Sequence, residues 1–174
     1  MVTALGLGPV VVGDPAGAVE TRLISDADAR VEEAKPGGNF GSSSRLVADL
    51  SPQTESYVRF TVPALEGTIT KATLRLRVED STGDGPKVRA ASSDWAESTL
   101  TWSTRPAPGA VLADAGKLSR NTWATYDVTA GVTGPGPVSF HLGADSKDGV
   151  TFTSRQSSRN RPELIVVGGG SVTT

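Results

Sequence analysis

Asp94-Trp-Ala-Glu-Ser-Thr-Leu-Thr-Trp-Ser-Thr-Arg-Pro106 combines two of the chain's three tryptophans with a run of small hydroxyl side chains. Trp95 and Trp102 can each bury a large apolar area, but each indole N–H then needs an acceptor, which Glu97 and the neighbouring hydroxyls can supply. Proline lacks an N–H and forces the preceding residue into extended geometry, so Arg105-Pro106 ends the segment. We interpret it as a structural corner, formed by Trp95, Glu97, Trp102 and Arg105, that fixes a long connection onto a β-sheet core. The alternative is a platform on which sugar rings stack.

Outside this segment, apolar and polar residues alternate with the period of two that is typical of β-strands. In residues 72–80, Ala, Leu, Leu and Val alternate with Thr, Arg, Arg and Glu. The same alternation marks residues 57–62, 138–142 and 150–155, and further strands are expected at 30–33, 45–49, 87–91, 123–128 and 163–167. About nine or ten strands, most with one apolar face, predict an all-β fold, a two-sheet antiparallel β-sandwich.

Two connections stand out between the predicted strands. Residues 92–120 form the longest interval without strand alternation and contain the corner, and we expect them to cross from one sheet to the other. Residues 130–133 follow two side chains that can cap a helix, Asp127 and Thr129, and are expected to form one helical turn.

Five stretches resemble, in order, the DNRLRE domain, which is also classed as carbohydrate-binding module family 96. Besides residues 95–106 they are Asp28-Ala-Arg-Val-Glu with Asn39-Phe-Gly-Ser-Ser-Ser, Tyr57-Val-Arg-Phe with Ala72-Thr-Leu-Arg-Leu, Tyr126-Asp-Val-Thr, and Thr153-Ser-Arg-Gln with Asn160-Arg-Pro-Glu-Leu-Ile-Val-Val. Together they cover residues 26–167. The resemblance implies a β-sandwich of jelly-roll type that binds polysaccharide, with acidic glycans similar to alginate as one ligand class.

The resemblance also matches Asn39, Phe40 and Arg155 to family positions, whereas Gln156 stands where the family usually has an acid. An alternative interpretation gives these residues a role in the fold. In that case Asn39 lies in a turn and Arg155 is buried against a carboxylate.

Composition excludes several classes of protein. A chain of 174 residues suits one domain with a sizeable core. The net charge of −2 gives no basic footprint for nucleic acid. The absence of cysteine excludes disulfides and thiolate metal sites.

The two ends differ from the middle. Residues 4–12 are apolar and residues 16–18 fit a small-x-small cleavage pattern, but no Lys or Arg precedes Arg22. We expect residues 1–20 to be a leader or signal-peptide remnant, with a disordered leader or an extra edge strand as alternatives; the run is too short for a membrane-spanning helix. Residues 21–168 form the module and 169–174 a Gly-rich linker or tail. A secreted or cell-surface location is expected.

The sequence predicts no catalytic function. His141 is the single histidine, it lies on the outer face of a predicted strand, and no Gly-x-Ser-x-Gly motif accompanies it. No pair of carboxylates has the context of a glycosidase site, and the Gly-rich stretches lack the ending of a phosphate-binding loop.

A structural calcium ion is the one cofactor for which the sequence offers ligands, because calcium prefers several oxygen ligands. The candidates are Asp26, Asp28, Asp80, Asp84, Asp145 and Asp148. The two Asp- and Gly-containing loops lack the Asp-x-Asp-x-Asp-Gly pattern, so ordinary turns are the alternative.

The remaining candidates are for binding. Outward-facing positions of the predicted strands supply Tyr57, Arg59, Arg75, Arg77, His141 and Arg155. Arginine matches a carboxylate with two parallel hydrogen bonds, which would suit an acidic polysaccharide if one sheet displays these residues. The alternative is solvated arginines that balance Glu79 and its neighbours.

Two functions therefore stay open. The first is a non-catalytic carbohydrate-binding module of an exported protein. The second is a structural or adhesive module of an extracellular assembly, which contacts copies of itself or other domains and has no sugar ligand. Neither requires nucleic acid or a membrane span.

Overall fold

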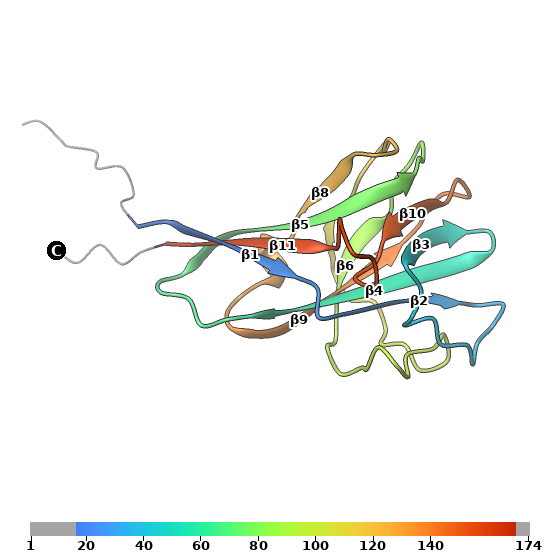
Figure 1. The fold of residues 1–174 in the computed structure, drawn as a ribbon, viewed down its shortest axis with the longest axis horizontal. Coiled ribbons are helices and arrows are strands. Elements are labelled where there is room, and N and C mark those ends of the chain that lie inside the picture. Colours follow the sequence, from blue (N-terminus) through green and yellow to red (C-terminus); the bar gives the residue numbers. More distant parts are fainter. Residues whose placement is uncertain (1–16, 170–174) are drawn as a thin grey trace, which may run out of the picture.

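The computed structural model describes residues 17–169, which fold into eleven strands and one 3-10 turn (Figure 1). The strands are β1 (Val19–Ile24), β2 (Ala27–Glu32), β3 (Arg45–Leu50), β4 (Gln53–Val62), β5 (Ile69–Asp80), β6 (Lys87–Ala91), β7 (Val111–Ala113), β8 (Trp123–Asp127), β9 (Gly136–Gly143), β10 (Val150–Thr153) and β11 (Glu163–Gly168). The turn is η1 (Thr129–Gly131). In this part of the chain no helix has the length and apolar character needed to cross a membrane.

The prediction of an antiparallel all-β sandwich is confirmed, and each of the nine predicted strands corresponds to a strand of the structure. The three-residue strand β7 was not predicted, and β1 was anticipated only through the alternative of an extra edge strand in residues 1–20. β1 begins at Val19 and pairs along its length with β11, so it starts within the segment interpreted as a leader. Residues 1–16 and 170–174, which hold most of the predicted leader and tail, lie outside the described residues.

The strands form two layers, which Figure 1 shows one above the other. The lower sheet has the order β2-β4-β9-β6-β7. In the upper sheet β8 and β11 flank β5, β1 pairs with β11, and β10 and β3 continue the sheet beside the end of β5. The β3–β4 hairpin joins the two layers, so the sheets are continuous along one side.

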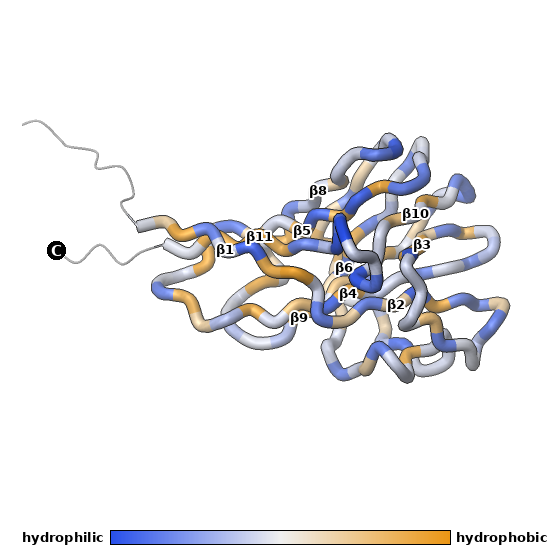
Figure 2. The backbone as a smooth tube through the Cα atoms, viewed as in Figure 1, coloured by the Kyte–Doolittle hydropathy of each residue, from blue (hydrophilic) through white to orange (hydrophobic). Residues whose placement is uncertain are grey.

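The main core lies between the layers. Ala72, Leu74, Leu76 and Val78 of β5 are fully buried and pack with the apolar face of the lower sheet, including Phe140. Hydrophobic and hydrophilic residues alternate along the strands in Figure 2, as expected for strands with one buried face. Burying each Leu or Phe side chain stabilises the fold by about 1.5–3 kcal/mol.

A second apolar cluster lies on the outer side of the lower sheet. The segment 92–110 between β6 and β7 lies below β4 and β2 in Figure 1, and its Leu100 packs on Tyr57, Ala29 and Val31. The interval 92–120 does connect the lower sheet to the upper one, because β8 pairs with β5. Before crossing, however, it covers the outer face of the lower sheet, which alternation within the strands could not reveal.

Gly41 marks the closest approach of this covering segment to the rest of the fold. A methyl group built on Gly41 would lie 2.1 Å from the carbonyl oxygen of Glu97, whereas one built on Gly37 would have no atom within 4 Å. We therefore expect Gly41→Ala to destabilise the protein by about 2 kcal/mol, a fall in Tm of about 4–8 °C by thermal unfolding. Gly37→Ala is the matched control and should unfold like the parent. Equal Tm values for the two variants would contradict the close approach.

Candidate functional site

Glu97 connects three segments that are far apart in the sequence. Its carboxylate accepts hydrogen bonds from the backbone N–H of Asp28 at 3.0 Å and from Nε and Nη2 of Arg155 at 2.6 and 2.9 Å. The backbone N–H of Arg155 in turn donates to Oδ2 of Asp28 at 2.7 Å. The covering segment is thereby tied to β2 and to the β10–β11 connection. Arg155 lies against a carboxylate, as in the fold-keeping interpretation.

The other family-matched positions complete this junction. Nδ2 of Asn39 donates to the carbonyl oxygens of Glu97 and Leu100 at 2.8 and 2.9 Å. Gln156, which replaces the acid expected there, donates from Nε2 to the carbonyl oxygen of Gly41 at 2.8 Å. The ring of Phe40 packs under the guanidinium of Arg30, whose Cζ lies 4.5 Å from the ring centroid.

The two tryptophans of the corner are half-buried and packed against the second apolar cluster. Nε1 of Trp95 donates to Oγ of Ser139 at 3.1 Å. Guanidinium groups lie over both rings, Arg59 at 5.1 Å from Trp95 and Arg105 at 3.5 Å from Trp102. Because these groups cover ring surface that a sugar would need, the geometry favours the structural corner over the stacking platform.

The structure divides the six binding candidates among three places. Tyr57, Arg59 and His141 lie on the outer face of the lower sheet, where Tyr57 and His141 are buried. Arg75 and Arg77 lie on the outer face of the upper sheet, and Arg155 belongs to the junction with Glu97. The condition that one sheet displays all six is therefore not met. Alternation gives the face of a strand but neither its sheet nor what covers it.

Trp123 on the upper sheet is a further candidate that the sequence interpretation left out. Its half-buried ring lies 4.5 Å from the guanidinium of Arg75 and 6.0 Å from that of Arg77. Arg75 is also paired with Glu163 at 2.9 Å. The available signal was a third tryptophan at an outward position of the predicted strand 123–128, directly opposite Arg77 in the register.

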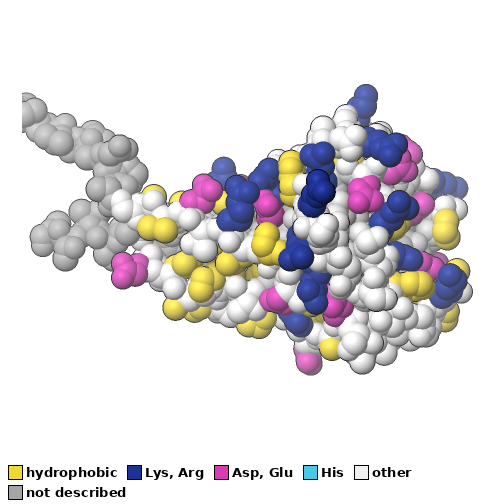
Figure 3. Space-filling model, viewed as in Figure 1, with side chains coloured by type: hydrophobic (Ala, Val, Ile, Leu, Met, Phe, Trp, Pro, Cys, Tyr) yellow, Lys and Arg dark blue, Asp and Glu magenta, His cyan; other side chains and the backbone are white. Residues whose placement is uncertain are grey.

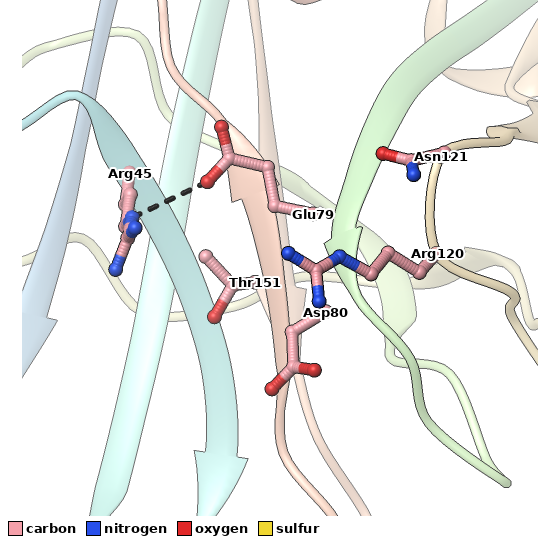
Figure 4. A pocket seen from close by; sticks show the side chains of 6 residues that line it. All are labelled: Arg45, Glu79, Asp80, Arg120, Asn121 and Thr151. Atoms are coloured by element: carbon pink, nitrogen blue, oxygen red, sulfur yellow. Dashed lines mark ion pairs between the residues drawn. The ribbon is translucent and has the colours of Figure 1, made fainter.

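A polar hollow of about 430 Å³ adjoins this surface where β3, β10 and the end of β5 meet the β7–β8 connection. Its lining residues are Arg45, Glu79, Asp80, Arg120, Asn121 and Thr151 (Figure 4). Nε of Arg45 lies 3.3 Å from Oε2 of Glu79, and 67% of the Arg45 side chain is exposed. The lining therefore offers guanidinium, amide, hydroxyl and carboxylate groups, the set that can bind sugar hydroxyls and carboxylates.

Lysines and arginines extend well beyond this hollow. In Figure 3 they are concentrated over the middle and right of the visible face, with acidic side chains among them, while hydrophobic side chains gather toward the end that carries β1. The side of the sandwich that this view shows therefore presents both charges to solvent.

Several proposed calcium ligands have protein partners. Asp26 accepts hydrogen bonds from Arg59 and Thr61, Asp145 pairs with Lys87, and Asp148 accepts the N–H of Gly83. Asp80 lines the polar hollow, and the carbonyl oxygen of Asp84 accepts a bond from Thr82. Among residues 17–169, no three His, Asp or Glu side chains are grouped as a metal site. Calcium stays a prediction.

Asp28 is the most perturbed acid of the junction. Burial raises its pKa to about 7, and the neighbouring carboxylate of Glu97 adds to the rise, although the N–H of Arg155 opposes it. Only 1% of its surface is exposed, and its Oδ1 has no hydrogen-bond partner among the described residues.

Comparison with known proteins gives one positive finding. The family model of carbohydrate-binding module family 96 matches residues 19–168, which spans all eleven strands. No curated protein matches the chain.

The raised pKa of Asp28 predicts a pH-dependent stability. The folded protein binds the proton of the Asp28 carboxyl group more tightly than the unfolded chain does. Protonated Asp28 therefore contributes its full stabilisation below about pH 4, and this contribution is lost as the pH rises toward 7. The loss amounts to at most about 4 kcal/mol. Asp28→Asn keeps an acceptor for Arg155 but cannot ionise. We expect its free energy of unfolding, minus that of the parent, to increase between pH 4 and 7 in denaturant titrations. A difference that is constant with pH would contradict the prediction.

Removing the charge of Glu97 should loosen the covering segment. Glu97→Gln keeps the size of the side chain but loses the charge-assisted bonds to Arg155, so we expect a loss of about 1–2 kcal/mol, discounted because both side chains are partly exposed. Glu66→Gln, at an exposed position, is the control. Tryptophan emission of Glu97→Gln should also shift to the red. Unchanged unfolding and emission would show that the junction does not depend on this charge.

Proposed function

The chain belongs to carbohydrate-binding module family 96, and from this we propose that it binds an acidic polysaccharide on the outer face of the upper sheet. Carbohydrate binding is the property that the family implies. The acidic nature of the glycan, the position of its site and export from the cell are our proposals.

The polar hollow is the observation that supports this site. It is open to solvent, its lining residues include no aromatic side chain, and its polar groups come from three strands and a connection. A polysaccharide must lie across a surface rather than enter a closed cavity, so an open hollow suits a chain ligand. Arg45 and Arg120 line it and Arg77 lies nearby on β5, so guanidinium groups are available for the carboxylates of uronic acids.

A non-catalytic role is part of the proposal. His141, the single histidine, is buried on the lower sheet beside Glu55 and therefore lies on the opposite layer from the hollow. In the hollow, both oxygens of Glu79 already have partners, Thr153 and Arg45.

The alternative function, a structural or adhesive module, has one observation in its favour. β1 is an edge strand, and Val19 and Ile24 on it are 62% and 45% exposed. An exposed edge strand with apolar side chains can pair with a second chain. Self-association at β1 is compatible with glycan binding at the hollow.

Affinity gel electrophoresis of the full chain tests the proposed site. We expect alginate and polygalacturonate to retard the protein more than neutral glycans such as β-glucan. Arg120→Ala and Arg77→Ala should each weaken binding about tenfold, the usual effect of removing a charge-assisted hydrogen bond. Arg159→Ala changes the net charge equally at an exposed position of the β10–β11 connection, and should bind like the parent.

The outcomes separate the proposals. Equal retardation of all variants by alginate would place the site elsewhere. Absence of retardation by any glycan, with the protein folded, would favour the structural module. Loss of binding in the presence of a chelator would support the predicted calcium ion.

A further inference from the structure

A second pocket, of about 380 Å³, lies on the outer face of the lower sheet, beside the covering segment. It lies among β4, β6 and β9, and Pro108 of the covering segment contributes to its wall. Its charged and polar side chains are Glu55, Lys87, Arg89, His141 and Asp145. We call it the lower pocket. It is separated from the polar hollow by the thickness of the sandwich, since the two lie on opposite sheets.

His141 brings an unused hydrogen-bonding atom to this pocket. Its side chain is buried, and Nε2 lies 3.1 Å from Oε2 of Glu55, although the two groups are not aligned for a linear hydrogen bond. Nδ1 has no partner among residues 17–169. A buried polar atom without a partner is costly, and a ligand that supplies the partner gains by relieving that cost.

The ionisation of Glu55 indicates which ring nitrogen of His141 is available to a ligand. Burial by itself would raise the pKa of Glu55, but His141 and the guanidinium of Arg105, whose Nε donates at 3.1 Å, together lower it. An ionised carboxylate can only accept hydrogen bonds, so Nε2 is the nitrogen that carries the proton. Nδ1 is then the ring nitrogen left for a ligand, and a hydroxyl can pair with it because a hydroxyl both donates and accepts hydrogen bonds.

Arg89 supplies the positive charge of the pocket. It lies directly opposite His141 on the neighbouring strand, so the two side chains are adjacent on one face. Its Nη1 donates a hydrogen bond to the carbonyl oxygen of Gly109 at 3.3 Å, and it forms no ion pair within the described part of the chain. Lys87, by contrast, is already paired with Asp145.

A complementary ligand therefore needs two groups close together. A carboxylate would pair with Arg89, and a hydroxyl would form a hydrogen bond with Nδ1 of His141. A neutral sugar lacks the first group, and a simple anion such as acetate lacks the second.

We propose that the lower pocket binds one uronic-acid residue, with its carboxylate on Arg89 and a hydroxyl on Nδ1 of His141. The choice of sugar acid rests on the proposed function, but the site is separate from the polar hollow. The module would then hold acidic glycan on both of its faces.

The single histidine makes this site measurable in the full chain. Nitrogen-proton spectra of the imidazole contain the signals of His141 alone, and they can be followed while galacturonate is added. We expect a saturable shift of the ring signals that is larger with galacturonate than with galactose or acetate. Arg89→Gln should weaken this binding at least about tenfold, whereas Arg120→Ala, in the polar hollow, should leave it unchanged.

Gly143→Ala provides a second variant that keeps every polar group. A methyl group at this position would lie 2.5 Å from Cε1 of His141, so the ring must move, and galacturonate binding should weaken without loss of any charge. Gly116→Ala, where a methyl group would meet no atom within 4 Å, should bind like the parent.

The outcomes distinguish this proposal from the proposed function. If alginate retards the protein but galacturonate does not shift the His141 signals, the lower pocket is not a uronate site. The proposed glycan site on the upper sheet would still be supported. If the signals shift but no glycan retards the protein, uronate binding in the lower pocket is supported and glycan binding at the upper site is contradicted. Equal shifts with galactose or with acetate would overturn recognition of a uronic acid.

Discussion

The ion pair between Glu97 and Arg155 is the interaction on which the outer arrangement of this sandwich depends. The main core closes the two sheets on each other without it, but the segment 92–110 has little regular structure and must be held by side chains. Glu97 holds it at β2 and at the β10–β11 connection at once. The nearby carboxylate of Asp28 is buried and accepts the backbone N–H of the same arginine, whose guanidinium is taken by Glu97. The burial of Asp28, with the carboxylate of Glu97 as a smaller contribution, explains why Asp28 retains its proton at a pH where surface carboxylates have lost theirs.

The covering segment gives the two faces of the sandwich different properties. On the lower sheet it converts outward positions such as Tyr57 into a second apolar cluster, and the lower pocket lies beside it. On the upper sheet no such segment among residues 17–169 packs on the outer face of β5, and arginines share the surface with Trp123 and the polar hollow. The two faces differ because of one connection rather than because of the strands themselves.

Sequence patterns were sufficient for the strands and for the fold class, because an alternating strand such as β5 reveals its period locally. They were also sufficient to single out residues 94–106 and to suggest Arg155 as a partner for a carboxylate. They failed for β7, which has three residues and too little sequence for a period, and for β1, whose apolar residues are partly exposed at an edge. Tyr57 and His141 were expected at the surface because burial by a distant segment depends on tertiary contacts. For the same reason the polar hollow, assembled from β3, β5, β10 and a connection, has no linear motif.

The pairing of β1 with β11 also determines how this module can be joined to other chains. Val19 lies opposite Gly168 in the register, and in Figure 1 this end of the sandwich is remote from β3 and β10, which carry the polar hollow. The points where the chain enters and leaves the fold are therefore neighbours at one pole. A module with this geometry can be set into a loop of a larger protein without separating the two ends of that loop. It would project from its host with the hollow at the free pole, accessible to a polymer several nanometres long.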